Sequence, residues 1–131
     1  MINETKASLA HIGEIIAMRY LVKLGLTILD KNYHSAYGEL DIIAQEKNEI
    51  IFAEVKTRTS HSLQAAENSI SLSKQKKITL TAMHYISKHP QLSNLSSRFD
   101  VLIVFHYPKD DTYKVIHYKN AFDPAIPGIS N

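Results

Sequence analysis

The sequence predicts an α/β domain in which a mixed sheet is flanked by helices. Two segments repeat apolar residues at helical spacing, and five others are short, apolar and rich in β-branched residues. They follow one another in the order α-β-β-β-α-β-β, which favours a sheet covered by helices. A chain of 131 residues is long enough to form one such domain with a hydrophobic core.

The first helix is predicted over residues 8–24, with Ser8 as its N-cap and Gly25 just past its end. The second is predicted over residues 73–89 and is ended by Pro90. The apolar positions that recur at helical spacing are Ile12, Ile16, Tyr20 and Leu24 in the first helix and Ile78, Ala82, Tyr85 and Ile86 in the second.

The strands are predicted at residues 26–33, 39–45, 50–57, 98–106 and 112–119. Between the third strand and the second helix, residues 58–72 are polar and predict a long loop or a poorly formed helix start. Residues 123–131 carry two prolines and a glycine, which predicts a loose tail after a single domain over residues 1–122.

Composition excludes several classes of protein. The chain has no cysteine, so it forms neither a disulfide scaffold nor a thiolate metal site, and its seven histidines show no metal-ligand spacing. The polar N-terminal residues predict no signal peptide, and no apolar stretch is long enough to span a bilayer. We therefore expect a cytoplasmic protein that does not enter a membrane. Because the net charge is only +2, any anionic partner must be held by local positive charge.

Strand register predicts that two carboxylates meet in the first hairpin. Whether the turn has two residues (47–48) or four (46–49), paired residues place Asp41 opposite Glu54. Opposed side chains lie roughly 4.5–5.5 Å apart at Cβ and share a face of the sheet. Lys56 falls on the same face by alternation, so the three side chains are expected to form one cluster.

Two adjacent carboxylates repel each other, and apolar neighbours make their ionised forms less stable still. The arrangement therefore requires a cation, supplied by Lys56 or by a hard divalent ion such as Mg²⁺ or Mn²⁺. Such an ion would make a metal-activated water available for phosphodiester hydrolysis, which Lys56 could assist. The alternative is an ordinary solvated hairpin in which Lys56 pairs with Glu39. Glu14, beside apolar positions of the first helix, either supports the metal or is stabilised by the helix N-terminus.

Basic residues near this hairpin are candidates for nucleic-acid contacts. Lys74, Lys76 and Lys77 open the second helix, where cations oppose the helix macrodipole, and together with free backbone N–H groups they could bind phosphate. The alternative is a solvated lysine cluster. Gln75 could orient a phosphate or a water, and Arg58 could contact a phosphate or form a surface salt bridge. For Arg98 and Asp100, at the start of a buried strand, a structural ion pair is expected.

A family resemblance joins these segments. It rests on residues 38–44 (GELDIIA) and 51–58 (IFAEVKTR), on Gly13-Glu14 and Ala17 of the first helix, and on several later positions. These later positions are Ser69, Ile70, Lys74, Lys76, Lys77, residues 98–101 and residues 120–122. In this combination the chain resembles the YraN-type family of predicted bacterial endonucleases, which is similar to archaeal Holliday junction resolvases and belongs to the PD-(D/E)XK nuclease superfamily.

The resemblance implies a restriction-endonuclease-like fold with Asp41 and Glu54 as metal ligands, Lys56 as the catalytic lysine and Glu14 completing the site. The superfamily proline before the aspartate is replaced by Leu40. The expected activity is metal-dependent hydrolysis of DNA, with branched or junction DNA as the first substrate to test and a homodimer as one arrangement that would cut paired strands. The alternatives are a non-catalytic nucleic-acid-binding module on the same fold and an adaptor that binds proteins.

Overall fold

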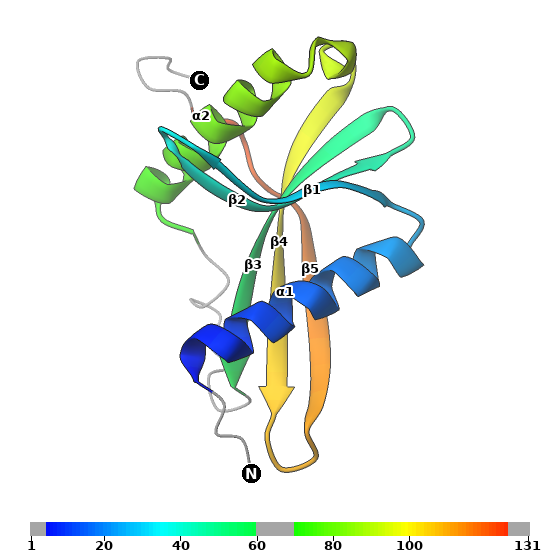
Figure 1. The fold of residues 1–131 in the computed structure, drawn as a ribbon, viewed down its shortest axis with the longest axis vertical. Helices are drawn as coiled ribbons and strands as arrows, with labels where there is room; N and C mark the ends of the chain where they lie inside the picture. Colours follow the sequence, from blue (N-terminus) through cyan, green and yellow to red (C-terminus); the bar gives the residue numbers. More distant parts are fainter. Residues whose placement is uncertain (1–4, 60–69, 126–131) are drawn as a thin grey trace.

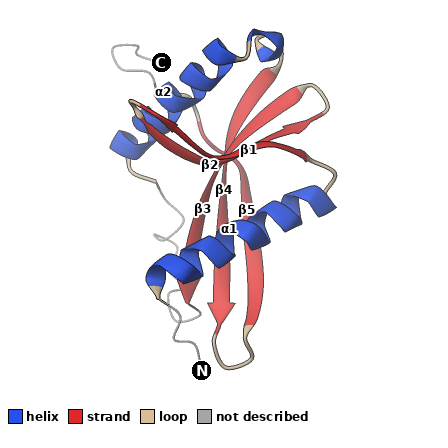
Figure 2. Cartoon of the chain, in the orientation of Figure 1, coloured by secondary structure: helices blue, strands red, loops and turns tan. Residues whose placement is uncertain are grey.

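The computed structural model describes residues 5–59 and 70–125, which form two α-helices and a five-stranded sheet (Figure 2). The elements are α1 (Lys6–Lys23), β1 (Thr27–Ser35), β2 (Gly38–Glu46), β3 (Glu49–Thr59), α2 (Leu72–Lys88), the short 3₁₀ helix η2 (Pro90–Leu92), β4 (Ser96–Tyr107) and β5 (Thr112–Phe122). The predicted order of helices and strands is confirmed, with η2 as the one addition within the described residues.

The sheet is mixed, as predicted. Its spatial order is β1-β2-β3-β4-β5, so every strand lies beside its neighbour in the sequence. All neighbours are antiparallel except β3 and β4, which run parallel because α2 carries the chain back along the sheet between them. β4 is buried along most of its length, in agreement with a strand covered on both faces.

The two helices cover opposite faces of this sheet (Figure 1). In β3, Ile51 and Ala53 pack in the core cluster that contains Ala17 and Leu21 of α1. The intervening Ile50 and Phe52 pack in a second cluster with Ile78, Ala82 and Tyr85 of α2. Since side chains of a strand alternate between faces, every even-numbered residue of β3 is expected on the α2 face.

Both helices are capped by hydroxyl side chains. In α1 the N-cap is Thr5, and Ser8 is the third helical residue that completes a capping box with it, so the prediction of Ser8 as N-cap is wrong by one turn. Gly25 follows the helix with φ of 99°, as predicted for a C-terminal glycine. In α2 the Ser71 side chain accepts a hydrogen bond from the Lys74 N–H at 3.2 Å.

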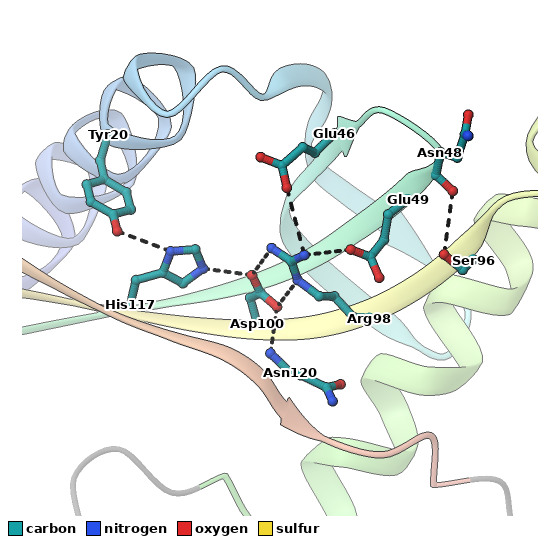
Figure 3. A network of polar contacts seen from close by, with 9 residues as sticks. All are labelled: Tyr20, Glu46, Asn48, Glu49, Ser96, Arg98, Asp100, His117 and Asn120. Atoms are coloured by element: carbon teal, nitrogen blue, oxygen red, sulfur yellow. Dashed lines mark hydrogen bonds and ion pairs between the residues drawn. The ribbon is translucent and has the colours of Figure 1, made fainter.

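A polar network on the α1 side links the β2–β3 hairpin, β4, β5 and α1 (Figure 3). Arg98 donates two hydrogen bonds to Asp100, at 2.9 and 3.1 Å, and a third to Glu49 at 2.6 Å. Asp100 also contacts His117 Nε2 at 2.7 Å, and His117 in turn contacts the Tyr20 hydroxyl of α1 at 3.2 Å. The predicted structural pair of Arg98 and Asp100 is confirmed, and it is the centre of this larger network.

Two predictions fall partly outside the described residues. The central part of the predicted loop, residues 60–69, and the end of the predicted tail, residues 126–131, lie beyond them. The predicted loop ends are strand and helix instead: β3 continues to Thr59, and α2 begins at Leu72. Neither α1 nor α2 has the length and apolar character needed to cross a membrane.

Candidate metal and nucleic-acid site

The β2–β3 hairpin has the predicted register, but its ladder ends one pair before the carboxylates. Paired residues run from Glu46 and Glu49 to Ile42 and Ala53. Direct backbone pairing of Asp41 with Glu54 is therefore wrong. The reason lies in Asp41 itself, because its Oδ2 accepts the Val55 N–H at 2.8 Å. The Asp41 carboxylate therefore occupies the Val55 N–H, which would bond to a backbone carbonyl of β2 if the ladder continued.

At the same residue β2 loses its regular alternation. Ile42 and Ala44 pack on the α1 side, yet Leu40 packs with Ile43 in the cluster on the α2 side. Leu40 and Ile42 would share a face in a regular strand, so the chain must turn at Asp41. Figure 1 shows that β2 and β3 run side by side at their shared hairpin and apart at their other ends. The site thus lies where two paired strands separate.

The Glu54 carboxylate is buried and only partly neutralised. Its side chain is 12% exposed, and its Oε1 lies 3.4 Å from the Lys74 Nζ of α2. Its Oε2 is shielded from solvent and has no hydrogen-bond partner among the described residues. Burial first, and then the nearby charge of Asp41, raise the pKa of Glu54 to about 8, although Lys74 opposes this effect. Protonation of Glu54 would allow a hydrogen bond to Asp41, which the two ionised groups cannot form.

Asp41 shares this environment. Burial raises its pKa, and the hydrogen bond from the Val55 N–H only partly offsets the effect. The half-buried Asp41 carboxyl and the buried Glu54 carboxyl, whose Oε2 lacks a donor among the described residues, form the hard oxygen donor set that Mg²⁺ and Mn²⁺ prefer. The residues present therefore suit a divalent ion held by Asp41 and Glu54.

Lys56 lies in the part of β3 that is regularly paired with β4, opposite Ile103. Since no irregularity interrupts this pairing, Lys56 and Glu54 point to the same face of the strand. This is the α2 face, because Phe52 on the same side packs against that helix. The predicted grouping of Lys56 with Glu54 on one face is thus reproduced, and the side chain is half-buried.

Glu14 approaches the carboxylates from α1. Its pKa is raised by burial and then by the charge of Asp41, while a hydrogen bond with Asn32 of β1 lowers it. Within residues 5–59 and 70–125, no group of three or more carboxylate or histidine side chains has a metal-ligating arrangement. The structure therefore places Glu14 within electrostatic range of Asp41, and its role as a further metal ligand stays a prediction.

The residues predicted to hold nucleic acid divide into two groups. Lys77 is exposed at the start of α2, and Lys76 beside it is half-buried. Two others have partners in the fold: the Gln75 amide donates to the Ile70 carbonyl at 2.8 Å, and Arg58 donates to the Thr57 carbonyl at 2.9 Å. Gln75 thus fixes the entry of α2, which sequence reasoning did not foresee.

Lys74 opens α2 as predicted and makes a contact that the sequence does not predict, because its ammonium lies 3.4 Å from Glu54 Oε1. Its contact with phosphate stays a prediction. The sequence holds no signal for this contact, since the two residues lie on different elements and meet only because α2 packs across β3. The hydrogen bond between Glu14 and Asn32 was missed for the same reason.

Comparison with known proteins places this arrangement in a family. The model of the family described as "Uncharacterised protein family UPF0102" matches residues 13–104, a span that includes Glu14, Asp41, Glu54 and Lys56. A UPF0102 protein of Caldanaerobacter subterraneus is 41% identical over 118 residues, which cover 89% of this chain and 96% of that protein. A UPF0102 protein of Clostridium botulinum is 43% identical over 110 residues, covering 84% and 89% of the two chains.

A UPF0102 protein of Clostridioides difficile shows the same level of identity, 43% over 110 residues, and these cover 84% of this chain and 92% of that protein. The resemblance to the YraN-type proteins is thereby confirmed at the level of the family. The family match covers α2 and the first three strands in full and parts of α1 and β4, so it includes residues of every element that contributes to the carboxylate cluster. This chain belongs to the UPF0102 family.

Proposed function

We propose that this protein is a metal-dependent endonuclease that hydrolyses DNA phosphodiester bonds. The observation that carries the proposal is the contact between Asp41 and Glu54, in which Glu54 Oε2 is buried and lacks a donor in the described part of the chain. Burying such a pair costs free energy that the fold does not need. A divalent cation bound between the two carboxylates would offset this free-energy cost.

Each residue of the site has a role in this reaction. Asp41 and Glu54 would hold Mg²⁺ or Mn²⁺, and the Val55 N–H fixes the orientation of the Asp41 carboxylate. When bound, such an ion supplies Lewis-acid chemistry that polarises a phosphodiester and makes water more acidic. Lys56, on the same face as Glu54, orients the attacking water or balances charge that develops on the phosphate oxygens.

Hydrolysis adds water to phosphorus and breaks one P–O bond to deoxyribose, which leaves one phosphate terminus and one hydroxyl terminus. Lys76, Lys77 and Arg58 would position the backbone by charge, with no base-reading element required. The α/β fold is consistent with a nuclease-like architecture, and the resemblance to resolvases favours branched DNA. A two-fold dimer would place two such sites on paired strands.

The test combines metal binding with cleavage. Mn²⁺ is titrated by calorimetry into the wild type and the Glu54→Ala variant, and both are then assayed on a panel of linear, flapped and four-way DNA with Mg²⁺ or Mn²⁺. We expect binding and cleavage in the wild type, and a loss of both in the variant. Asp110→Ala, which removes an exposed carboxylate of the β4–β5 turn, serves as the control that keeps both properties.

The result that would overturn the proposal is DNA binding that depends on salt but needs no metal and leads to no cleavage. Such a result would identify a nucleic-acid-binding module on this fold. An adaptor protein would show neither metal uptake nor salt-dependent affinity for DNA. RNA of matched structure belongs in the same panel, because contacts to phosphate alone do not distinguish the two nucleic acids.

A further inference from the structure

A lysine from α2 reaches into the carboxylate pair. The Lys74 Nζ lies 3.4 Å from Glu54 Oε1, while 44% of the lysine side chain remains exposed against 12% of the glutamate. The lysine therefore extends from the surface toward a buried partner. Its stem has several rotatable bonds, so the ammonium can leave this contact and return to solvent without movement of the helix.

The helix itself gives no reason for a cation at this position. Lys74 lies in the first turn of α2, where the positive end of the macrodipole disfavours a lysine. This turn holds no acidic residue that could compensate. The contact with Glu54 is thus the interaction that explains the placement of Lys74, and it acts between elements rather than within the helix.

One ammonium cannot satisfy the pair. Lys74 brings a single positive charge to Oε1, whereas Asp41 and Glu54 together bring up to two negative charges, and Oε2 keeps no donor within the described residues. A divalent ion bound by Asp41 and Glu54 would compete with Lys74, because both cations are attracted to the Glu54 carboxylate and repel each other.

We propose that Lys74 is an internal counter-ion that competes with the divalent ion for Glu54 and, once displaced, offers its ammonium to the phosphate of the substrate. This inference rests on the proposed function. It separates Lys74 from Lys76 and Lys77, which have no such contact with Glu54 among the interactions of the described residues. Lys74 thus acts on metal affinity through Glu54, and its release couples metal uptake to binding of the nucleic acid.

Substitution of Lys74 should change the affinities for metal and for DNA in opposite directions. Lys74→Gln removes the competing charge, so Mn²⁺ should bind about 5-fold more tightly than to the wild type at low salt. The same variant should bind branched DNA more weakly in Ca²⁺, which prefers the same oxygen ligands. The slope of log affinity against log salt concentration should fall by about one phosphate contact. A merely destabilised protein would lose affinity for both ligands.

Two further variants make the comparison specific. Lys77→Gln removes the same charge from an exposed position at the start of the same helix, so it controls for the overall charge of the protein. Lys74→Arg keeps a cation at Glu54 and should restore the weaker, wild-type affinity for Mn²⁺. Calorimetry with Mn²⁺ is performed on all four proteins at one pH and one ionic strength, and circular dichroism melting verifies that each is folded.

Each outcome decides between the two proposals. Tighter Mn²⁺ binding in Lys74→Gln alone supports the counter-ion, even where no DNA is cleaved and the nuclease function fails. Equal Mn²⁺ affinity in Lys74→Gln and Lys77→Gln, or weaker affinity in Lys74→Gln, overturns the inference while the nuclease function stands. Failure of Mn²⁺ to bind either the wild type or Lys74→Gln contradicts both.

Discussion

At the scale of single residues, Glu54 is held where its ionised form is unfavourable. The pKa of its carboxyl group is raised to about 8 from 4.5, chiefly by burial and then by Asp41. Between these two values the folded protein binds a proton that the unfolded chain releases. The free energy of unfolding therefore falls as the pH rises from about 4.5 to 8 in the absence of metal.

Glu54→Gln tests this cost directly. The amide is neutral at every pH, so we expect the variant to be more stable than the wild type at pH 8, by on the order of 2 kcal/mol, and nearly equal to it at pH 4.5. The measurement is urea denaturation in EDTA at both pH values. Glu39→Gln, at an exposed carboxylate of the neighbouring strand, should show no comparable gain.

Addition of Mn²⁺ should reverse the order, since only the wild type keeps both carboxylates and a bound ion stabilises the folded state. If the wild type were as stable at pH 8 as Glu54→Gln, the ionised form of Glu54 would not be unfavourable in the fold. The cost of burying the two carboxylates would then no longer support a bound cation.

At the scale of elements, the close approach of α1 to β3 positions the site. A Cβ atom at Gly13 would collide with the Thr57 side chain, so helix and strand touch there through backbone and a short side chain. Glycine is unfavourable inside a helix, and this contact explains its presence. The next residue is Glu14, whose distance from Asp41 therefore depends on how closely the helix lies against the sheet.

Gly13→Ala should force α1 away from β3. Overpacking of this kind costs about 1–3 kcal/mol, and we expect a corresponding fall in the melting temperature despite the better helix propensity of alanine. Metal affinity should fall as well if Glu14 contributes to the site. The check is a double-mutant cycle with Thr57→Ala, in which the second substitution should recover part of the stability. Strict additivity of the two effects would argue against the contact.

At the scale of the whole molecule, the network around Asp100 joins the hairpin turn, β4, β5 and α1. Burial alone would raise the pKa of Asp100, but hydrogen bonds from His117 and Arg98 outweigh it and lower the pKa below 3.8. This carboxylate therefore stabilises the fold fully above about pH 4, and the contribution is lost as the pH falls through the lowered value.

Asp100→Asn should destabilise the protein by about 3 kcal/mol at neutral pH, because it leaves a mostly buried Arg98 with one partner fewer and removes a buried charge pair. Urea denaturation measures the loss. The exposed Asp110→Asn in the β4–β5 turn is the matched control and should have little effect. Similar stability of the two variants would show that the network contributes nothing to the fold.

Much of this arrangement follows from local sequence. The short turn at Lys47 and Asn48 fixes the hairpin register, since a turn of two residues and one of four give the same pairs. The alternation of side chains along a strand places Glu54 and Lys56 on one face of β3. Helical periodicity with Gly25 and Pro90 locates both helices to within about two residues at most ends.

Tertiary structure decided the remainder. The turn of β2 at Asp41 arises because its carboxylate bonds the Val55 N–H, a competition between side chain and backbone that periodicity does not reveal. Lys74 reaches Glu54 only through the packing of α2 on β3. The sequence alone determined that Glu54 and Lys56 share one face of β3. The partners of these side chains were determined by packing. Contacts between distant elements depend on how the helices pack on the sheet, and no local sequence pattern encodes this.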